Sequence, residues 1–385
     1  MEEKPLHILF LCSWYPNPES NTNGIFIKRH AQALALKHYV TVLFVKSIHS
    51  KQIASIKAEE GNLKEILVYY PKTKIQIPII SNIIKFLKFK SLYKKQIDLL
   101  NQEFDIIHVN TIFPAAIPAL YAIKKFPKAK LFITEHWSGY YPEDANYKGF
   151  LIERYTKKIV EKAKGIFVIS EKLKIAMQNH KLINHYELIN NAVDTSIFKP
   201  IKSNNRISDT LQILHVSSLV DKEKNITGII KIAEQLKKNN IPFNLTIIGD
   251  NLDELNNHKK NAYKNLTTSE IVFVGYKTPA EIADFMNQSD VFLLFSHYEG
   301  MPVVLIEAMA CGLPVITTNV GQVNEMVKPE MGIILNSNDI NECVEKLCKF
   351  KRTTFLNGEL MKLEIEKKYG YESIGNTLTK LYTNN

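Results

Sequence analysis

The chain has 385 residues, of which 45% are hydrophobic and 23% charged, a composition typical of a globular protein with room for two domains. Its formal net charge of +10 favours anionic partners and does not choose among phosphates, acidic lipid surfaces and nucleic acid. No segment approaches the roughly 20 apolar residues of a membrane span. Acidic residues precede the short apolar run at the start, which argues against a signal peptide.

The cysteines indicate the cellular compartment. The chain has four: Cys12, Cys311, Cys343 and Cys348. They form no CxxC pair, and no histidines lie near them at the spacing of a zinc site. Such residues suit a reducing environment, so we expect a cytoplasmic protein. The basic residues are scattered, and no nucleic-acid-binding motif is recognisable, so we expect no nucleic-acid partner.

Short apolar segments rich in β-branched and aromatic residues alternate with amphipathic stretches along the chain. The first series of predicted strands comprises 7–12, 40–45, 105–110, 130–135 and 165–170. The second comprises 212–218, 244–250, 271–275, 291–296, 313–318 and 332–335. This alternation predicts two α/β domains, each a doubly wound, Rossmann-like parallel sheet covered by helices.

The polar, proline-containing stretch 199–209 predicts the domain boundary, with an N-terminal domain over 1–199 and a C-terminal domain over 210–370. Ligands of open parallel sheets lie outside the carboxyl ends of the strands. We therefore expect the site in the cleft between the two domains.

The segment 290–321 is the most informative part of the sequence. It predicts a buried strand ending near Ser296, a polar turn, and a helix that starts at Pro302 and that Gly312 ends. The unpaired N–H groups at the start of this helix and its dipole form an anion site suited to a diphosphate. Gly300 in the turn allows a close approach of the backbone.

Two carboxylates lie beside this anion site. Glu299 is in the turn, and Glu307 lies about 8 Å along the helix from Pro302, at roughly 1.5 Å per residue. They would repel a bare phosphate, but each can accept hydrogen bonds from sugar hydroxyls. The alternative is that both are ordinary solvated residues. The apolar surroundings of Glu307, VVLIEAMA, argue against a solvent-facing helix surface.

The spacing from Glu299 to Glu307 resembles the E-x7-E motif of the family-four glycosyltransferases, retaining enzymes of the GT-B fold. Other segments are similar to the family's in order and spacing: GIFIKRHAQAL (24–34), TEHWSGY (134–140), ELINNAVDTSIFKP (187–200) and LTIIGD (245–250). The resemblance implies transfer of a sugar from a nucleotide diphosphate donor. It also implies that a last helix, about 371–385, packs on the first domain.

The resemblance implies these roles for single residues. Glu299 and His136 would act at the donor sugar, with His136 also near the acceptor. Glu307 would hold the ribose, and the backbone from Val274 to Tyr276 would frame the base. The remaining donor-binding residues would contact the diphosphate: Gly24, Ser218, Lys224, Gly300, Met301, Pro302 and Val303. Trp137 and Tyr140 would either stack on a sugar or belong to the core.

The sequence departs from the family's pattern at one place. The segment HVSSLVDKEKN (215–225) has Ser217 and Ser218 where a glycine and a phosphate-binding arginine are expected. A serine can donate a hydrogen bond but carries no charge. Lys224 is then the remaining cation of this segment at the diphosphate, unless Lys28, Arg29 or Lys222 compensates.

We therefore expect a retaining glycosyltransferase that uses a glycan or lipid-linked acceptor, in surface polysaccharide or glycolipid synthesis. No DxD-like motif is visible, so we expect neither a metal nor a cofactor. The alternatives are a catalytically weak or inactive nucleotide-sugar-binding protein, and an epimerase or hydrolase of the same fold.

The basic, apolar stretch 74–102 bears on the acceptor. As a helix it could lie on an acidic membrane surface, which would make the protein peripheral at the inner face of the membrane. The alternative is a helix of the first domain with a solvated lysine face. Lys85, Lys88 and Lys90 are the residues whose substitution would separate the two interpretations.

Overall fold

The computed structural model describes residues 4–73, 75, 77–201 and 209–384. The chain divides into two compact units, Met1–Ala192 with Tyr371–Asn385, and Val193–Gly370. The first change of unit thus lies upstream of 199–209, of which residues 202–208 lie outside the described part. The reason is local: Val193 N donates to Tyr369 O (2.8 Å) and Thr195 Oγ1 to Glu366 (2.7 Å), so the chain packs in the second unit from Val193 on.

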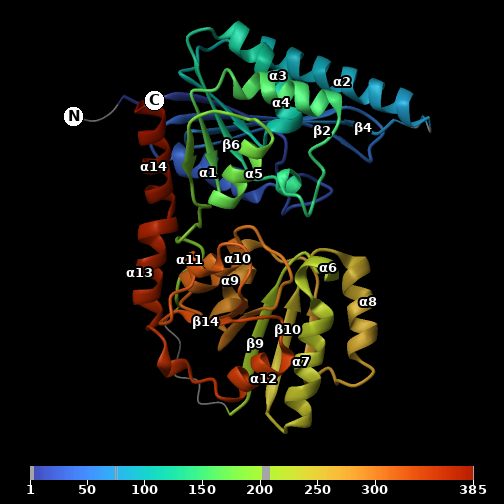
Figure 1. The fold of residues 1–385 in the computed structure, drawn as a ribbon, viewed down its shortest axis with the longest axis vertical. Helices are drawn as coiled ribbons and strands as arrows, with labels where there is room; N and C mark the ends of the chain where they lie inside the picture. Colours follow the sequence, from blue (N-terminus) through green and yellow to red (C-terminus); the bar gives the residue numbers. More distant parts are fainter. Residues whose placement is uncertain (1–3, 74, 76, 202–208, 385) are drawn as a thin grey trace. The chain divides into compact units, whose positions relative to one another are not determined.

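The first unit is built on an eight-stranded sheet of order β3-β4-β2-β1-β5-β6-β7-β8 (Figure 1). Its strands are β1 (His7–Cys12), β2 (Tyr39–Ile48), β3 (Ala54–Glu60), β4 (Leu63–Pro71), β5 (Ile106–Asn110), β6 (Lys130–Glu135), β7 (Gly165–Val168) and β8 (Tyr186–Leu188). Its helices are α1 (Ile25–Ala35), α2 (Pro78–Asp98), α3 (Ile112–Lys125), α4 (Phe150–Val160), α5 (Glu171–Asn179) and α14 (Tyr371–Thr383), with a 3-10 turn at Ser138–Tyr140. All neighbouring strands are parallel except β3, which is antiparallel to β4.

The last helix completes the core of the first unit. Ile374, Leu378 and Tyr382 of α14 are buried with the apolar residues of α1 and of the sheet. Gly375 allows this packing, because a Cβ there would lie 2.6 Å from Ala33 O of α1. The Tyr382 hydroxyl lies 2.5 Å from Nδ1 of His108 on β5, so α14 also meets the polar interior of the sheet.

The second unit contains a six-stranded, fully parallel sheet of order β11-β10-β9-β12-β13-β14. Its strands are β9 (Leu211–Val216), β10 (Phe243–Ile248), β11 (Ile271–Val274), β12 (Val291–Leu294), β13 (Val315–Thr318) and β14 (Gly332–Leu335). Its helices are α6 (Asp221–Lys224), α7 (Ile226–Lys238), α8 (Leu252–Ala262), α9 (Pro279–Asn287), α10 (Val303–Ala310), α11 (Val323–Met326), α12 (Ile340–Cys348) and α13 (Gly358–Tyr369), with a 3-10 turn at Arg352–Thr354.

The strand orders locate the functional loops. In each sheet the chain winds outward from the first strand in one direction and then in the other, which places a switch point between β1 and β5 in the first unit and between β9 and β12 in the second. Loops at the carboxyl ends of strands beside a switch point are where open α/β sheets bind ligands. The loops that follow β9 and β12 carry 217–220 and 295–302. These are the segments that the sequence analysis singled out.

Candidate active site

The anion site predicted from the sequence corresponds to the N-terminus of α10. This helix begins at Val303 after the N-cap Pro302, no side chain caps it, and its first turn holds no acidic residue. Its end is also as predicted, because Gly312 follows with φ of 70°. The first-turn amides of an uncapped helix, with the positive end of its dipole, favour a negative charge in front of them.

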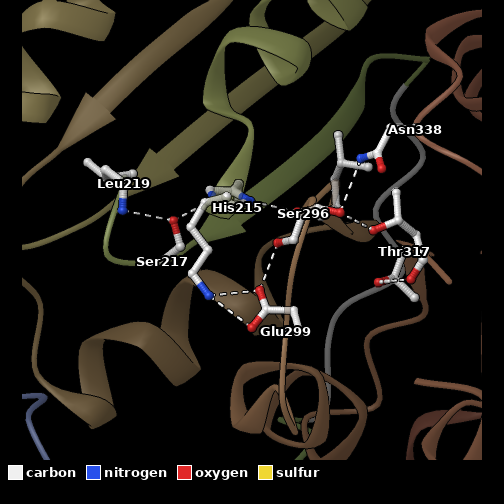
Figure 2. A network of polar contacts seen from close by, with 10 residues as sticks. His215, Ser217, Leu219, Ser296, Glu299, Thr317 and Asn338 are labelled. Atoms are coloured by element: carbon white, nitrogen blue, oxygen red, sulfur yellow. Dashed lines mark hydrogen bonds and ion pairs between the residues drawn. The ribbon is translucent and has the colours of Figure 1, made fainter. Parts of the chain in front are cut away.

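Glu299 is held in place just before this helix. Its side chain is 8% exposed, and it accepts a hydrogen bond from Ser296 Oγ at 2.7 Å (Figure 2). Lys224 Nζ, at the end of α6, donates to both carboxylate oxygens, at 2.8 and 2.9 Å. The side chain of Lys224 is itself only 18% exposed. The structure therefore joins into one buried ion pair two residues to which the sequence analysis gave separate roles.

The loop that carries Glu299 is fixed by residues that the sequence analysis missed. The carbonyl of Ser296 accepts hydrogen bonds from Thr318 Oγ1 (2.7 Å) and Asn338 Nδ2 (3.1 Å). Figure 2 shows Asn338 reaching this carbonyl from a segment distant in sequence. At Gly321, with φ of 59°, a Cβ would lie 2.4 Å from Glu299 O, so only glycine permits this contact between the two turns. No sequence motif identifies Asn338 as part of this site.

The hydroxyl of Ser217 is engaged in hydrogen bonds within the second unit. Nδ1 of the buried His215 lies 2.8 Å from Leu293 O, so it must donate, which leaves Nε2 to accept from Ser217 Oγ at 2.7 Å. Ser217 Oγ in turn accepts from Leu219 N at 3.1 Å. Burial lowers the pKa of His215 to about 4, which keeps the ring neutral in this arrangement. Ser218 is half-buried, and its hydroxyl has no hydrogen-bond partner among the described residues.

The remaining predicted donor-site residues lie around α10 and at the end of β11. Glu307 is 8% exposed, and Met301 and Pro302 are also buried. Neither Glu299 nor Glu307 is thus a solvated surface residue. The half-buried Gly300 and Val303 border the helix start. The half-buried Val274 accepts a hydrogen bond from Gly249 N (3.1 Å), whereas the side chain of Tyr276 is 44% exposed.

In the first unit, His136 directly follows β6. Its ring lies 4.2 Å from that of Phe26 and 5.9 Å from that of His30, measured between centroids. Burial holds the pKa of His136 well below its usual value, so the ring is neutral. Its Nε2 is buried without a hydrogen-bond partner among the described residues. A ring nitrogen in this state is suited to a ligand hydroxyl.

Glu135 orients the His136 segment, and the sequence analysis did not single it out. This fully buried carboxylate accepts hydrogen bonds from the backbone N of His136 (2.8 Å) and Trp137 (2.9 Å) through Oε1. Oε2 accepts from Ile112 N (3.0 Å) and the Tyr140 hydroxyl (3.1 Å). Tyr140 is 1% exposed and belongs to the core, whereas Trp137 is half-buried.

Three further residues named from the sequence have roles within the first unit. Gly24 has φ of 67°, and a Cβ there would lie 2.6 Å from the Trp14 carbonyl carbon, so the loop after β1 itself requires glycine. Arg29 is buried and donates to Ala192 O (3.5 Å), and Lys28 pairs with Glu65 (3.2 Å). Both cations are thus engaged inside this unit, whereas Lys222 of the second unit is exposed.

Two doubly wound α/β units, with a buried Lys–Glu pair and an uncapped helix N-terminus at the switch point of the second, define the class: a glycosyltransferase of the GT-B fold. Residues 24–197 match Glycosyltransferase Family 4, and residues 197–362 match Glycosyl transferases group 1. The chain belongs to this family of glycosyltransferases.

Solved structures agree on the fold. The chain superposes on a sucrose-phosphate synthase from Thermosynechococcus elongatus with a TM-score of 0.76 and 18% identity, covering 98% of both chains. It superposes on HepE from Anabaena, solved in complex with UDP and glucose, with a TM-score of 0.67 and 15% identity, covering 99% of this chain and 100% of that one.

Three curated relatives are similar in sequence. A glycosyltransferase of Methanocaldococcus jannaschii without assigned substrates is 27% identical over 82% of this chain and 88% of its own length. An Escherichia coli UDP-Gal:α-D-GlcNAc-diphosphoundecaprenol α-1,3-galactosyltransferase is 28% identical over 44% of this chain and 46% of that protein. The Staphylococcus aureus capsular polysaccharide biosynthesis glycosyltransferase CapM is 28% identical over 51% of this chain and 50% of its own length. The last two alignments span about half of each relative.

Proposed function

We propose that this enzyme transfers a sugar from a nucleotide diphosphate donor to a glycan or lipid-linked acceptor, with retention of the anomeric configuration, in the synthesis of a surface polysaccharide or glycolipid. The observation that carries the proposal is the buried Lys224–Glu299 pair, with Glu299 in the turn that leads into the uncapped N-terminus of α10. It combines a carboxylate for a sugar with cationic and N–H groups for a diphosphate.

The arrangement suits the charge that develops during transfer. Breaking the bond between the sugar and the diphosphate leaves negative charge on the diphosphate and positive charge on the sugar. The first-turn amides of α10 stabilise the former without reorganising. Lys224 has three N–H donors and gives two contacts to Glu299, so its third can reach a phosphate oxygen. Lys224 would then bridge the leaving group and Glu299.

Glu299 would accept hydrogen bonds from hydroxyls of the donor sugar, next to the reacting carbon. Glu307, five residues after Pro302 and on the same buried helix, would accept from the ribose hydroxyls. The backbone from Val274 to Tyr276 would frame the base at the end of β11. In the first unit, the neutral His136 would offer its unpaired Nε2 to a hydroxyl of the sugar or the acceptor.

Two of the relatives support the substrate classes. The Escherichia coli enzyme takes its sugar from a UDP donor and acts on a diphosphoundecaprenol-linked acceptor, and CapM acts in capsular polysaccharide biosynthesis. We propose that transfer needs no metal and no cofactor, because α10 and Lys224 supply the charge that a cation would. We propose the cytoplasm as the compartment, because all four cysteines are free thiols. No nucleic-acid partner is proposed.

One observation favours a second candidate, a catalytically weak or inactive nucleotide-sugar-binding protein. The segment after β9 supplies no arginine, and the Ser217 hydroxyl is used by His215 and Leu219. The assay that separates the candidates incubates the enzyme with nucleotide sugars and total lipid extract, and follows release of the nucleoside diphosphate. Transfer that Glu299→Ala abolishes supports the proposed function. Donor binding without turnover supports the weaker candidate.

Retention is tested separately. The anomeric configuration of the first-formed product, read by NMR coupling constants, must match that of the donor. An inverted product would refute the retaining mechanism while leaving the transferase activity intact.

A further inference from the structure

The helix α2 carries an apolar stripe that no described residue covers. Ile80, Ile83, Ile84 and Leu87 are spaced i, i+3, i+4, i+7, so they lie on one face of its first half. All four are exposed, with Ile83 at 53% and Leu87 at 58%. Ser81, which lies off this stripe, is buried, and Tyr93 and Ile97 further along α2 are fully buried, so α2 packs on the first unit. The stripe is therefore turned away from the core and has no partner within the described structure.

Toward the C-terminus of α2 the exposed face becomes basic. Lys90, Lys94 and Lys95 are exposed there, and the only acidic residue of α2 is Asp98, 3.8 Å from Lys94. Of the three lysines that the sequence analysis named, only Lys90 is exposed. Lys85 and Lys88 are half-buried, and Lys88 Nζ lies 5.4 Å from the centre of the Tyr70 ring. The lysines in the first half of α2 are thus partly covered, and the exposed residues there are mostly apolar.

A second helix extends this surface. The rings of Phe86 on α2 and Tyr155 on α4 are 6.2 Å apart, and Figure 1 shows the two helices running beside one another. At the start of α4, Phe150 is 73% and Leu151 45% exposed. Arg154, one turn on, lies with its guanidinium carbon 5.7 Å from the centre of the Phe150 ring. Apolar side chains and cations thus adjoin on both helices.

We propose that the exposed faces of α2 and α4 dock on an anionic lipid bilayer, with Ile80, Ile83, Ile84, Leu87, Phe150 and Leu151 entering the acyl boundary and Lys90, Lys94, Lys95 and Arg154 contacting headgroups. An amphipathic helix with an apolar face and a basic margin binds at this interface. Basic residues near the surface add attraction to acidic lipid headgroups. None of the helices in the described part of the chain is long and apolar enough to cross a bilayer, so attachment through α2 and α4 would be peripheral.

The charges favour a lipid surface over a second copy of this chain. In a symmetric dimer with parallel α2 helices the lysines of one copy would lie close to those of the other, and like charges in contact are destabilising. With antiparallel helices the lysines of each copy would lie against the apolar stripe of the other, which leaves their charges without a partner. A bilayer containing acidic lipids supplies the opposite charge along the whole face.

The test is flotation of the full chain with vesicles of phosphatidylcholine alone or with one third phosphatidylglycerol, without donor or acceptor, so that its result is independent of the transferase activity. We expect binding to the acidic vesicles. Ile83→Ser with Leu87→Ser should weaken it at least tenfold. Each substitution in the set Lys90→Gln, Lys94→Gln and Lys95→Gln should weaken it about fivefold, and high salt should weaken it further.

The matched control is Ile175→Ser with Ile183→Ser, which removes two isoleucines that are 54% and 71% exposed elsewhere on the first unit and should leave binding unchanged. A fluorescent NBD label at Leu87→Cys, in a Cys348→Ser background, should shift to the blue with acidic vesicles. The proposal is overturned if the wild type binds neither vesicle type, or if the control double variant loses as much binding as the Ile83, Leu87 double variant. It is also overturned if sedimentation shows a dimer that the Ile83, Leu87 double variant dissociates.

Discussion

Lys224 Nζ donates to both carboxylate oxygens of Glu299, at 2.8 and 2.9 Å, and both side chains are largely withdrawn from water. A buried ion pair costs desolvation for each partner, and removing one partner leaves the other charge unpaired. This pair is also the only described contact of Lys224 with a carboxylate. Lys224 is therefore the cation that compensates the buried carboxylate of Glu299.

Replacing the cation Lys224 should destabilise the second unit. Lys224→Met leaves Glu299 buried and uncompensated, and we expect the free energy of unfolding to fall by about 3 kcal/mol near pH 7.5. Thermal or urea denaturation measures the loss. The surface pair Lys277–Glu281 is the control, because Lys277→Met should cost under about 0.5 kcal/mol. Combining Lys224→Met with Glu299→Gln should recover part of the loss, and additive losses would mean that the two residues do not depend on each other.

Restoring the missing arginine should strengthen donor binding. The half-buried Ser218 has no described hydrogen bond, so Ser218→Arg adds a charge without removing a contact. A charge-assisted hydrogen bond to phosphate should tighten binding of the nucleoside diphosphate about tenfold. Calorimetric titration measures the affinity. Ser269→Arg adds the same charge at an exposed site of the second unit and should have little effect. Equal gains from both variants would indicate a general effect of charge and would argue against a phosphate site at Ser218.

Substitution of Glu307 should change the affinity for a nucleoside diphosphate and not the affinity for pyrophosphate. If its carboxylate holds the ribose, Glu307→Gln should weaken binding of the nucleoside diphosphate by tenfold or more. Inorganic pyrophosphate lacks the ribose, and its affinity should not fall. Competition between the two ligands in a fluorescence or calorimetric titration gives both values. Parallel losses for the two would place Glu307 at the diphosphate and refute the ribose assignment.

The buried His215 predicts a dependence of stability on pH. Its pKa in the folded protein is lowered to about 4, against about 6.5 in an unfolded chain. Between these values the unfolded state binds a proton that the folded state excludes, so stability falls as the pH drops from about 6.5 toward 4. At pH 5 this residue alone should cost on the order of 2 kcal/mol relative to pH 7.5.

The measurement compares the wild type with His215→Gln at pH 7.5 and pH 5. The variant is less stable at pH 7.5 because it loses the bonds to Leu293 and Ser217, but its further loss on acidification should be smaller. His185→Gln, at an exposed position, is the control. The same loss on acidification in the variant and the wild type would show that His215 does not titrate on unfolding.

Residues with a local pattern were predictable from the sequence. The strands of the second unit and the limits of α10 follow from buried apolar runs, from Pro302 and from Gly312, and the structure has them. In the first unit β3, β4 and β8 were not predicted. β8 has only three residues, and all seven residues of β3 are exposed, with two alanines and one isoleucine as its apolar side chains. β3 pairs only with β4 and is an edge strand.

Contacts between distant segments were not predictable. Nothing near Asn338 or Glu135 in the sequence indicates that the first holds the Ser296 carbonyl and the second accepts four hydrogen bonds. Ser217 stands where the family has a glycine, and its bond to the neighbouring buried His215 could not be predicted because it depends on the fold. Gly24 was assigned to a ligand, whereas the backbone of the preceding loop already requires it.

The most direct test of the central claim is thermal stabilisation by UDP, GDP, ADP and CMP, each with magnesium and with EDTA. At about 100 times its dissociation constant, the nucleotide of the donor should stabilise the protein by roughly 2.7 kcal/mol, with or without metal. The Glu307→Gln variant, with at least tenfold weaker binding, should lose about half of this shift or more. If no nucleoside diphosphate stabilises either the wild type or Ser218→Arg, the N-terminus of α10 is not a donor site and the account is wrong.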